Sequence, residues 1–164
     1  AAIAEQAEKD RNAMGEYEVP MNENCSQREF LAHAAIDATR KLGVAGIITD
    51  SLTGETVRHL AAFRGPNPIL AICYNEKTQR WLNLSFGVIA IHQKDKISPN
   101  YMFTAALRML RQKGYITLDD KIAYLSGSFG LGNPGGTTFL EINKVRQVFD
   151  KSYKFHLPNK ENDK

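Results

Sequence analysis

The segment 49-TDSLTGETVRHLAAFRGPNPILAIC-73 decides the fold class of this chain. It starts at the end of an apolar run, passes through a turn with several hydroxyl groups and one glycine, and continues into a helical pattern. The apolar residues of that pattern have the i, i+3, i+4 spacing of a helix with one buried face: Val57, Leu60 and Ala61. A second apolar run follows at residues 69–73. Two apolar strands joined by a helix predict a βαβ unit with parallel strands.

The same alternation of strand and helix extends over most of the chain. The capping box 26-SQRE-29 opens a helix, and its expected apolar face consists of Phe30, Ala34, Ala38 and Leu42. Asn75 can cap a short helix, and Ser98 followed by Pro99 opens a longer one. Strands are predicted at residues 44–49, 69–73, 88–91, 121–126 and 137–143.

The last two predicted strands have no helix between them. The nine-residue loop that joins them, residues 128–136, is too short for a parallel crossover, so the fifth strand should be antiparallel. The expected fold class is therefore α/β, a three-layer sandwich around a five-stranded, mostly parallel sheet with an antiparallel last strand.

Composition limits the function classes. The chain has 164 residues, 43% hydrophobic and 24% charged, and its net charge is only +3, with basic residues spread along the sequence. A nucleic-acid partner and a membrane span are therefore not expected. Two cysteines without a CxxC motif favour a reduced, cytoplasmic protein. The four histidines are isolated, so we expect no metal site and no catalytic residues.

The turn at residues 51–56 is the first candidate site. It lies between the end of a strand and the start of a helix, where free amides and the helix dipole favour an anion. Ser51, Thr53 and Thr56 add hydroxyl groups, and Gly54 allows a phosphate to approach the backbone closely. The alternative is that Thr53 simply caps the helix. A lysine of the P-loop type is absent, so the turn does not indicate magnesium-nucleotide chemistry.

The glycine-rich segment 126-SGSFGLGNPGGTTFLEIN-143 is the second candidate. Its backbone amides could cradle a phosphate. Equally, the glycines could serve only as a connection between two strands.

Several of these motifs, taken in order, resemble one known family. They are FLAHAAIDATRKLGVAGIIT at 30–49, TGET at 53–56, AAFRGPNPILAIC at 61–73, the segments 81–91 and 114–121, and the closing strand at 137–142. Together, residues 27–143 resemble the C-terminal domain of pyruvate kinase, and AAIAEQAE at the start resembles the last helix of the catalytic barrel. The expected organisation is the end of that helix at 1–14, a linker at 15–25, the α/β domain at 26–146 and a C-terminal tail at 147–164.

The resemblance implies a regulatory and oligomerisation domain that is inactive alone. The parent enzyme would transfer phosphate from phosphoenolpyruvate to ADP, using magnesium and potassium in the barrel. A sugar-phosphate effector would bind Ser51, Thr53, Gly54 and Thr56, beside an effector loop that contains Gly127, Ser128, Gly132, Gly135 and Gly136. The partners would be the barrel and a second copy, which would pair by two-fold symmetry through the helix at 27–42 and the last strand. The alternatives are a free-standing domain that binds or acts on a phosphorylated metabolite, and a structural domain without a ligand.

Two departures from the family pattern predict weak affinity for bisphosphorylated sugars. Leu52 stands where many regulated members have a basic residue, and the charge of Glu55 should repel a phosphate. In addition, the loop contains no cation between Ser126 and Gly136.

Overall fold

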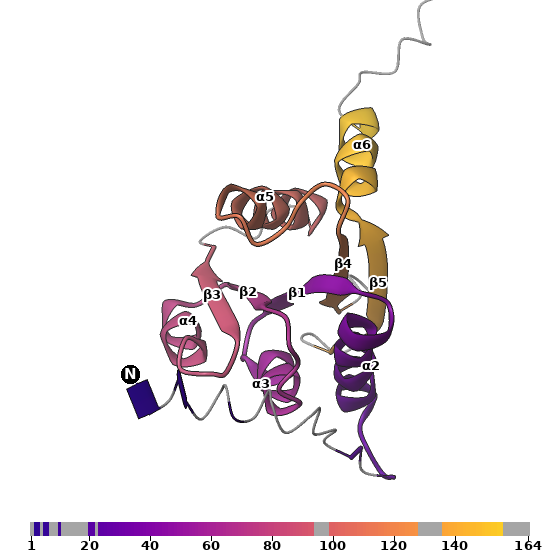
Figure 1. Ribbon diagram of the computed structural model, residues 1–164. Helices are drawn as coiled ribbons and strands as arrows, with labels where there is room; N and C mark the ends of the chain where they lie inside the picture. Colours follow the sequence, from indigo (N-terminus) through magenta and orange to yellow (C-terminus); the bar gives the residue numbers. More distant parts are fainter. Residues whose placement is uncertain are drawn as a thin grey trace, which may run out of the picture.

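The computed structural model describes residues 2–3, 5–6, 10, 20–21, 23–93, 99–127 and 136–155 (Figure 1). In chain order, the elements are α2 (Gln27–Lys41), β1 (Val44–Ser51), α3 (Glu55–Ala62), β2 (Ile69–Cys73), α4 (Glu76–Leu82), β3 (Val88–His92), α5 (Pro99–Gln112), β4 (Lys121–Ser126), β5 (Phe139–Lys144) and α6 (Val145–Phe155).

The five strands form one sheet in the order β3-β2-β1-β4-β5. The pairs β3–β2, β2–β1 and β1–β4 are parallel, and β5 is antiparallel to β4. The register places Ser51 opposite Cys73, so β1 and β2 end at the same edge of the sheet. The fold class predicted from the sequence, including the antiparallel last strand, is confirmed.

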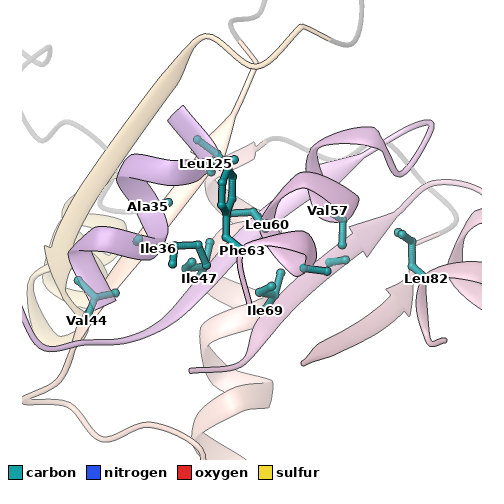
Figure 2. Packing of buried hydrophobic residues seen from close by; sticks show 14 of the residues in the cluster. Ala35, Ile36, Val44, Ile47, Val57, Leu60, Phe63, Ile69, Leu82 and Leu125 are labelled. Carbon is teal, nitrogen blue, oxygen red and sulfur yellow. The ribbon is translucent and has the colours of Figure 1, made fainter. Parts of the chain in front are cut away.

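Helices cover both faces of the sheet and make three layers. Figure 1 shows α2, α3 and α4 on one side of the sheet and α5 on the other. The first core lies between the sheet and α2, α3 and α4 (Figure 2), and its labelled members are Ala35, Ile36, Val44, Ile47, Val57, Leu60, Phe63, Ile69, Leu82 and Leu125. The second core packs α5 against the other face, mainly through Phe103, Ala106, Leu107 and Leu110. The three central strands β2, β1 and β4 are thus buried on both sides, as a parallel sheet requires, whereas the edge strand β5 has no fully buried residue.

Helix α2 starts where the capping box predicts, but it buries a different face. The Ser26 hydroxyl accepts a hydrogen bond from the Glu29 amide at 3.2 Å. Phe30 and Leu42, expected in the core, are 53% and 52% exposed. Ala38 of the expected face is buried, and the other buried residues of α2 are Ala32, Ala35, Ile36 and Thr39. The expectation was wrong because a series with a constant spacing of four residues turns by about 40° at each step around a helix with 3.6 residues per turn.

Helix α6 was not predicted. From the sequence, a tail is expected from residue 147, whereas the chain continues as α6 to Phe155. Val145 is fully buried, and Val148 and Phe149 pack against the second core. These three residues have the i, i+3, i+4 spacing of a helical face. The signal was therefore present in the sequence, although it was too short to stand out.

Only part of the N-terminal segment lies among the described residues. Residues 2–3, 5–6 and 10 are helical, and the Gln6 side chain donates a hydrogen bond to Asp10 at 2.8 Å. The assignment of residues 1–14 to a barrel helix stays a prediction.

Ser98, the expected cap of α5, lies outside the described residues. None of the helices that the structure describes combines the length and the apolar character needed to cross a membrane.

Candidate anion-binding site

The turn between β1 and α3 lies at the carboxyl edge of the parallel strands. The chain leaves β1 through α3 to reach β2 on one side, while β4 pairs with β1 on the other side. This is a topological switch point, the position at which open α/β sheets bind their ligands. The first candidate site predicted from the sequence therefore lies where the fold favours a ligand.

Gly54 shapes this turn. It is the residue that precedes the first turn of α3, and its φ of 85° lies in the left-handed region that favours glycine. Its amide donates a hydrogen bond to the Ser51 hydroxyl at 2.8 Å, and its carbonyl accepts the Arg58 amide at 3.0 Å. The amides of residues 55–57 precede that first helical bond and therefore have no partner within α3.

The alternative in which Thr53 caps α3 is wrong. Gly54 occupies the N-cap position, and no side chain caps the helix there. Thr53 is instead exposed at the surface of the turn. Its hydroxyl is thus open to a ligand, whereas Ser51 is 7% exposed and is committed as an acceptor to the Gly54 amide.

Thr56 points into the protein. It is 6% exposed, and its hydroxyl lies 2.7 Å from that of Thr137, which is equally buried. This hydrogen bond joins the first turn of α3 to the residues that enter β5. Of the four predicted ligand residues, Thr56 therefore has a structural contact that accounts for its hydroxyl.

The glycine-rich segment is described only at its ends. Gly127 and Gly136 lie side by side, since a Cβ atom added to Gly127 would collide with the Gly136 carbonyl oxygen. The Thr138 amide donates a hydrogen bond to the Ser126 carbonyl at 2.9 Å, and this bond also holds the two ends of the segment together. Ser128, Gly132 and Gly135 lie outside the described residues, so their expected role in an effector loop stays a prediction.

The charge of Glu55 has a partner that the sequence alone does not reveal. Its carboxylate lies 2.5 Å from the Arg28 guanidinium of α2. An opposite charge this close offsets much of the field that Glu55 would exert on a phosphate. The expected repulsion by Glu55 is accordingly weaker than the sequence alone suggests.

Asp50 is the polar residue that sequence reasoning missed at this edge. Ser126 donates its hydroxyl to one carboxylate oxygen, and Tyr74 donates its hydroxyl to the other at 3.3 Å. These contacts join the ends of β1, β2 and β4. The signal in the sequence is an acidic residue at the end of an apolar strand, but such a residue is equally typical of an ordinary turn.

The two tyrosines near Asp50 have raised pKa values. Burial, followed by the Asp50 charge, raises the pKa of the Tyr74 phenol above its usual value. The same two causes, burial first, raise the pKa of Tyr124 to about 12. Both phenols therefore stay neutral at physiological pH, and Tyr74 can donate its proton to the carboxylate.

Comparison with known families identifies the chain. The family described as "Pyruvate kinase, alpha/beta domain" matches residues 29–143. The chain belongs to the pyruvate kinase family. This agrees with the resemblance that the motifs showed.

The relatives of this pyruvate kinase domain are much longer proteins. The pyruvate kinase of Borreliella burgdorferi is 31% identical over 149 residues, which cover 90% of this chain and 31% of that protein. The pyruvate kinase of Bacillus licheniformis is 29% identical over 123 residues, which cover 75% of this chain and 20% of that protein. The chain thus spans about a third of one relative and a fifth of the other.

A solved structure shows the same fold. The structure described as "Cryptosporidium parvum pyruvate kinase in complex with ADP" matches with a TM-score of 0.70 at 18% identity. The match covers 76% of this chain and 25% of that chain.

Three further titratable residues, His33, His92 and Cys73, have structural surroundings in this pyruvate kinase domain. The ring of His33 packs edge-on against Phe63, and His92 lies 3.7 Å from Glu76. Cys73 is fully buried, and burial raises the pKa of its thiol to about 11, so the thiolate is scarce at neutral pH. Among the described residues, no His, Cys, Asp and Glu side chains gather into a group that could hold a metal ion.

Proposed function

We propose that this chain is the C-terminal regulatory and oligomerisation domain of a cytoplasmic pyruvate kinase and that it has no phosphotransfer activity alone. The family match over residues 29–143 carries this proposal. The parent enzyme would transfer phosphate from phosphoenolpyruvate to ADP, and the solved complex of the Cryptosporidium parvum pyruvate kinase with ADP supports that reaction class. Magnesium and potassium would belong to the barrel of the parent enzyme.

An activity assay tests the first part of this proposal. The purified chain is expected to produce no pyruvate from phosphoenolpyruvate and ADP when magnesium and potassium are present. A full-length family member, assayed under the same conditions, serves as the positive control. Sustained turnover by the chain, at a rate that survives further purification, would show that it is an enzyme in its own right.

The second part of the proposal concerns a ligand. We propose that the turn at residues 51–56 binds one phosphate group of a phosphorylated effector. The amides of residues 55–57, the positive end of α3 and the exposed Thr53 hydroxyl support this assignment. Gly54 supports it further, because its left-handed φ of 85° sets the turn from which α3 starts.

A titration with inorganic phosphate tests this site. We expect the backbone amide signals of Gly54, Glu55 and Thr56 to shift in NMR spectra of the whole chain, with saturation. Thr53→Val should weaken the binding severalfold, because it removes an exposed hydroxyl donor without changing the shape of the side chain. Thr117→Val is the control, since that threonine lies in another turn, where it bonds Asp120. Equal shifts across all surface amides would contradict the proposal.

We also propose that the chain pairs with a second copy. The support is the position of β5, which is the last strand in the order and so offers one side for pairing. Helix α2 supports it through exposed Phe30 and Leu42. A two-fold arrangement would place the same surface of both copies in contact.

A further inference from the structure

Strand β5 lies at the end of the sheet, and β4 pairs with only one of its two sides. The Val145 amide donates a hydrogen bond to the Asp120 carbonyl at 2.9 Å, in the register of the β4–β5 ladder. Ladder bonds between antiparallel strands recur at every second residue, so the odd-numbered residues of β5 bond to β4. The backbone groups of the even-numbered residues therefore point outward, where no other described strand pairs with them: Leu140, Ile142 and Lys144.

Two-fold symmetry restricts the ways in which β5 can pair with its own copy. Rotation about an axis normal to the sheet keeps each side chain on its own face, and residues opposite each other in an antiparallel pair share a face. The two residue numbers of every opposing pair must therefore add up to an even number. Because β5 starts at Phe139 and α6 starts at Val145, only two such registers place five residues of each copy in the ladder.

The two registers differ in the residue that lies on the symmetry axis. In the first register, Glu141 lies opposite Glu141 of the second copy. The even-numbered residues make the hydrogen bonds between the copies, so this is a non-hydrogen-bonded pair, in which opposing side chains lie closest. Two carboxylates at that spacing repel each other. In the second register, Ile142 lies opposite Ile142, and Glu141 lies opposite Asn143.

Asn143 is a suitable partner for the Glu141 carboxylate. Within one copy, the side-chain amide of Asn143 donates a hydrogen bond to Glu141 at 2.5 Å. A side-chain amide has two hydrogens, which leaves the second one for Glu141 of the other copy. The two-fold axis generates this contact twice. Leu140 and Lys144 form the other opposing pair, in which the lysine stem covers the leucine while its ammonium group stays in water.

We propose that β5 pairs with β5 of a second copy in the register that places Ile142 on the two-fold axis, and that Glu141 selects this register. The inference rests on the self-association proposed above. The edge is self-complementary in this register, because three outward-facing backbone positions bond in reciprocal pairs. The single carboxylate of β5 meets an amide instead of its own copy.

Disulfide formation between copies measures the register. Ile142→Cys, in a Cys25→Ser background, places two thiols opposite each other at the axis. Opposing Cα atoms of a hydrogen-bonded pair lie about 5.5 Å apart, which is within the range of a disulfide. Cys73 is fully buried and does not compete. Under mild oxidation this variant should form a covalent dimer with itself, and mixing it with Leu140→Cys should add no mixed dimer.

Glu141→Gln tests the cause of the selection. Without the charge, the register centred on residue 141 is no longer disfavoured. Ile142→Cys should then lose about half of its self-crosslinking, and mixed dimers with Leu140→Cys should appear. Circular dichroism checks that each variant keeps the fold.

A second measurement leaves the apolar side chains of β5 unchanged. Asn143→Asp places a carboxylate opposite Glu141 at two positions of the dimer, and it should raise the dissociation constant of the dimer, measured by sedimentation, about fivefold. Asn75→Asp is the matched control. It adds the same charge at the N-cap of α4, where Asn and Asp are nearly equivalent, and it should leave the dissociation constant unchanged.

Each outcome decides between the two proposals. If the unmodified chain is a monomer at high micromolar concentration, the self-association is wrong and this inference is wrong with it. If the chain dimerises but Ile142→Cys crosslinks only with Leu140→Cys, the register is centred on Glu141 and only this inference is overturned. A dimer that forms no disulfide at either position and does not respond to Asn143→Asp overturns the pairing through β5.

Discussion

At the scale of single residues, Gly65 shows how closely the loop after α3 approaches α2. A Cβ atom at this position would lie 2.8 Å from Cδ1 of Ile36, which is 1% exposed in the first core (Figure 2). Real Cβ atoms are essentially never found at this distance from another heavy atom. A close backbone approach, and not a special φ, therefore requires glycine here.

Gly65→Ala is expected to lower the free energy of unfolding by about 1–3 kcal/mol, which is the usual cost of overpacking. Ile36→Val removes the Cδ1 atom, so the double variant should be more stable than the sum of the two single effects predicts. Urea denaturation of the four proteins measures this coupling. Strictly additive effects would show that the contact is not the cause.

The hydrogen bond between Thr56 and Thr137 is a second test at this scale. Thr56→Val should cost about 1–3 kcal/mol, because it leaves the buried Thr137 hydroxyl without its partner. The double variant with Thr137→Val should recover part of that loss, since both polar groups are then removed. Thr53→Val is the control and should change stability by less than about 0.5 kcal/mol, because Thr53 is exposed. Thermal unfolding of each variant provides the comparison.

At the scale of elements, α2 has two different faces. Its buried side consists of small residues and Ile36, which allows the helix to lie close to the sheet. Its other side carries Phe30 at the first turn, and exposed Leu42 follows the last turn. A large aromatic side chain that is half exposed buries little of its apolar surface within its own chain, so that surface is available to a partner.

Phe30→Glu should therefore reduce self-association and leave the fold intact. The new charge would have to be desolvated in an interface between two copies, whereas it stays in water in a monomer. Sedimentation or light scattering at high micromolar concentration measures the effect, and circular dichroism checks the fold. Tyr115→Glu is the control, because Tyr115 is 50% exposed in the connection after α5. A monomeric unmodified chain would contradict the interface proposed for α2 and β5.

At the scale of the whole molecule, the sequence predicts the succession of helices and strands along the chain and the direction of the strands, but not their order in the sheet. Continuous apolar runs identify buried strands, and the short connection before β5 excludes a parallel crossover. These signals are local, so one sequence is enough to read them. The same holds for the capping box at Ser26, which acts over only three residues.

At the candidate site, what the sequence did not predict depends on contacts between distant segments. Asp50 and Ser126 are 76 residues apart, and Thr56 and Thr137 are 81 apart, so no local pattern joins them. The pairing of Glu55 with Arg28 likewise requires α2 and α3 to be packed first. Such contacts define the arrangement of charges around the candidate site, and for this reason only the structure reveals that arrangement.

Because Gly127 and Gly136 lie next to each other, the sequence that joins them can vary in evolution without moving the strands on either side. Both ends of the glycine-rich segment are fixed to the domain, one to β1 through Ser126 and Asp50 and the other to α3 through Thr137 and Thr56. The residues between the two ends can therefore be replaced by another sequence, because the hydrogen bonds that fix the ends are made by residues outside that stretch. Doubling its length would cost only about 0.6 kcal/mol in loop closure. Natural variation or laboratory grafting can thus replace this segment without changing its two attachment points.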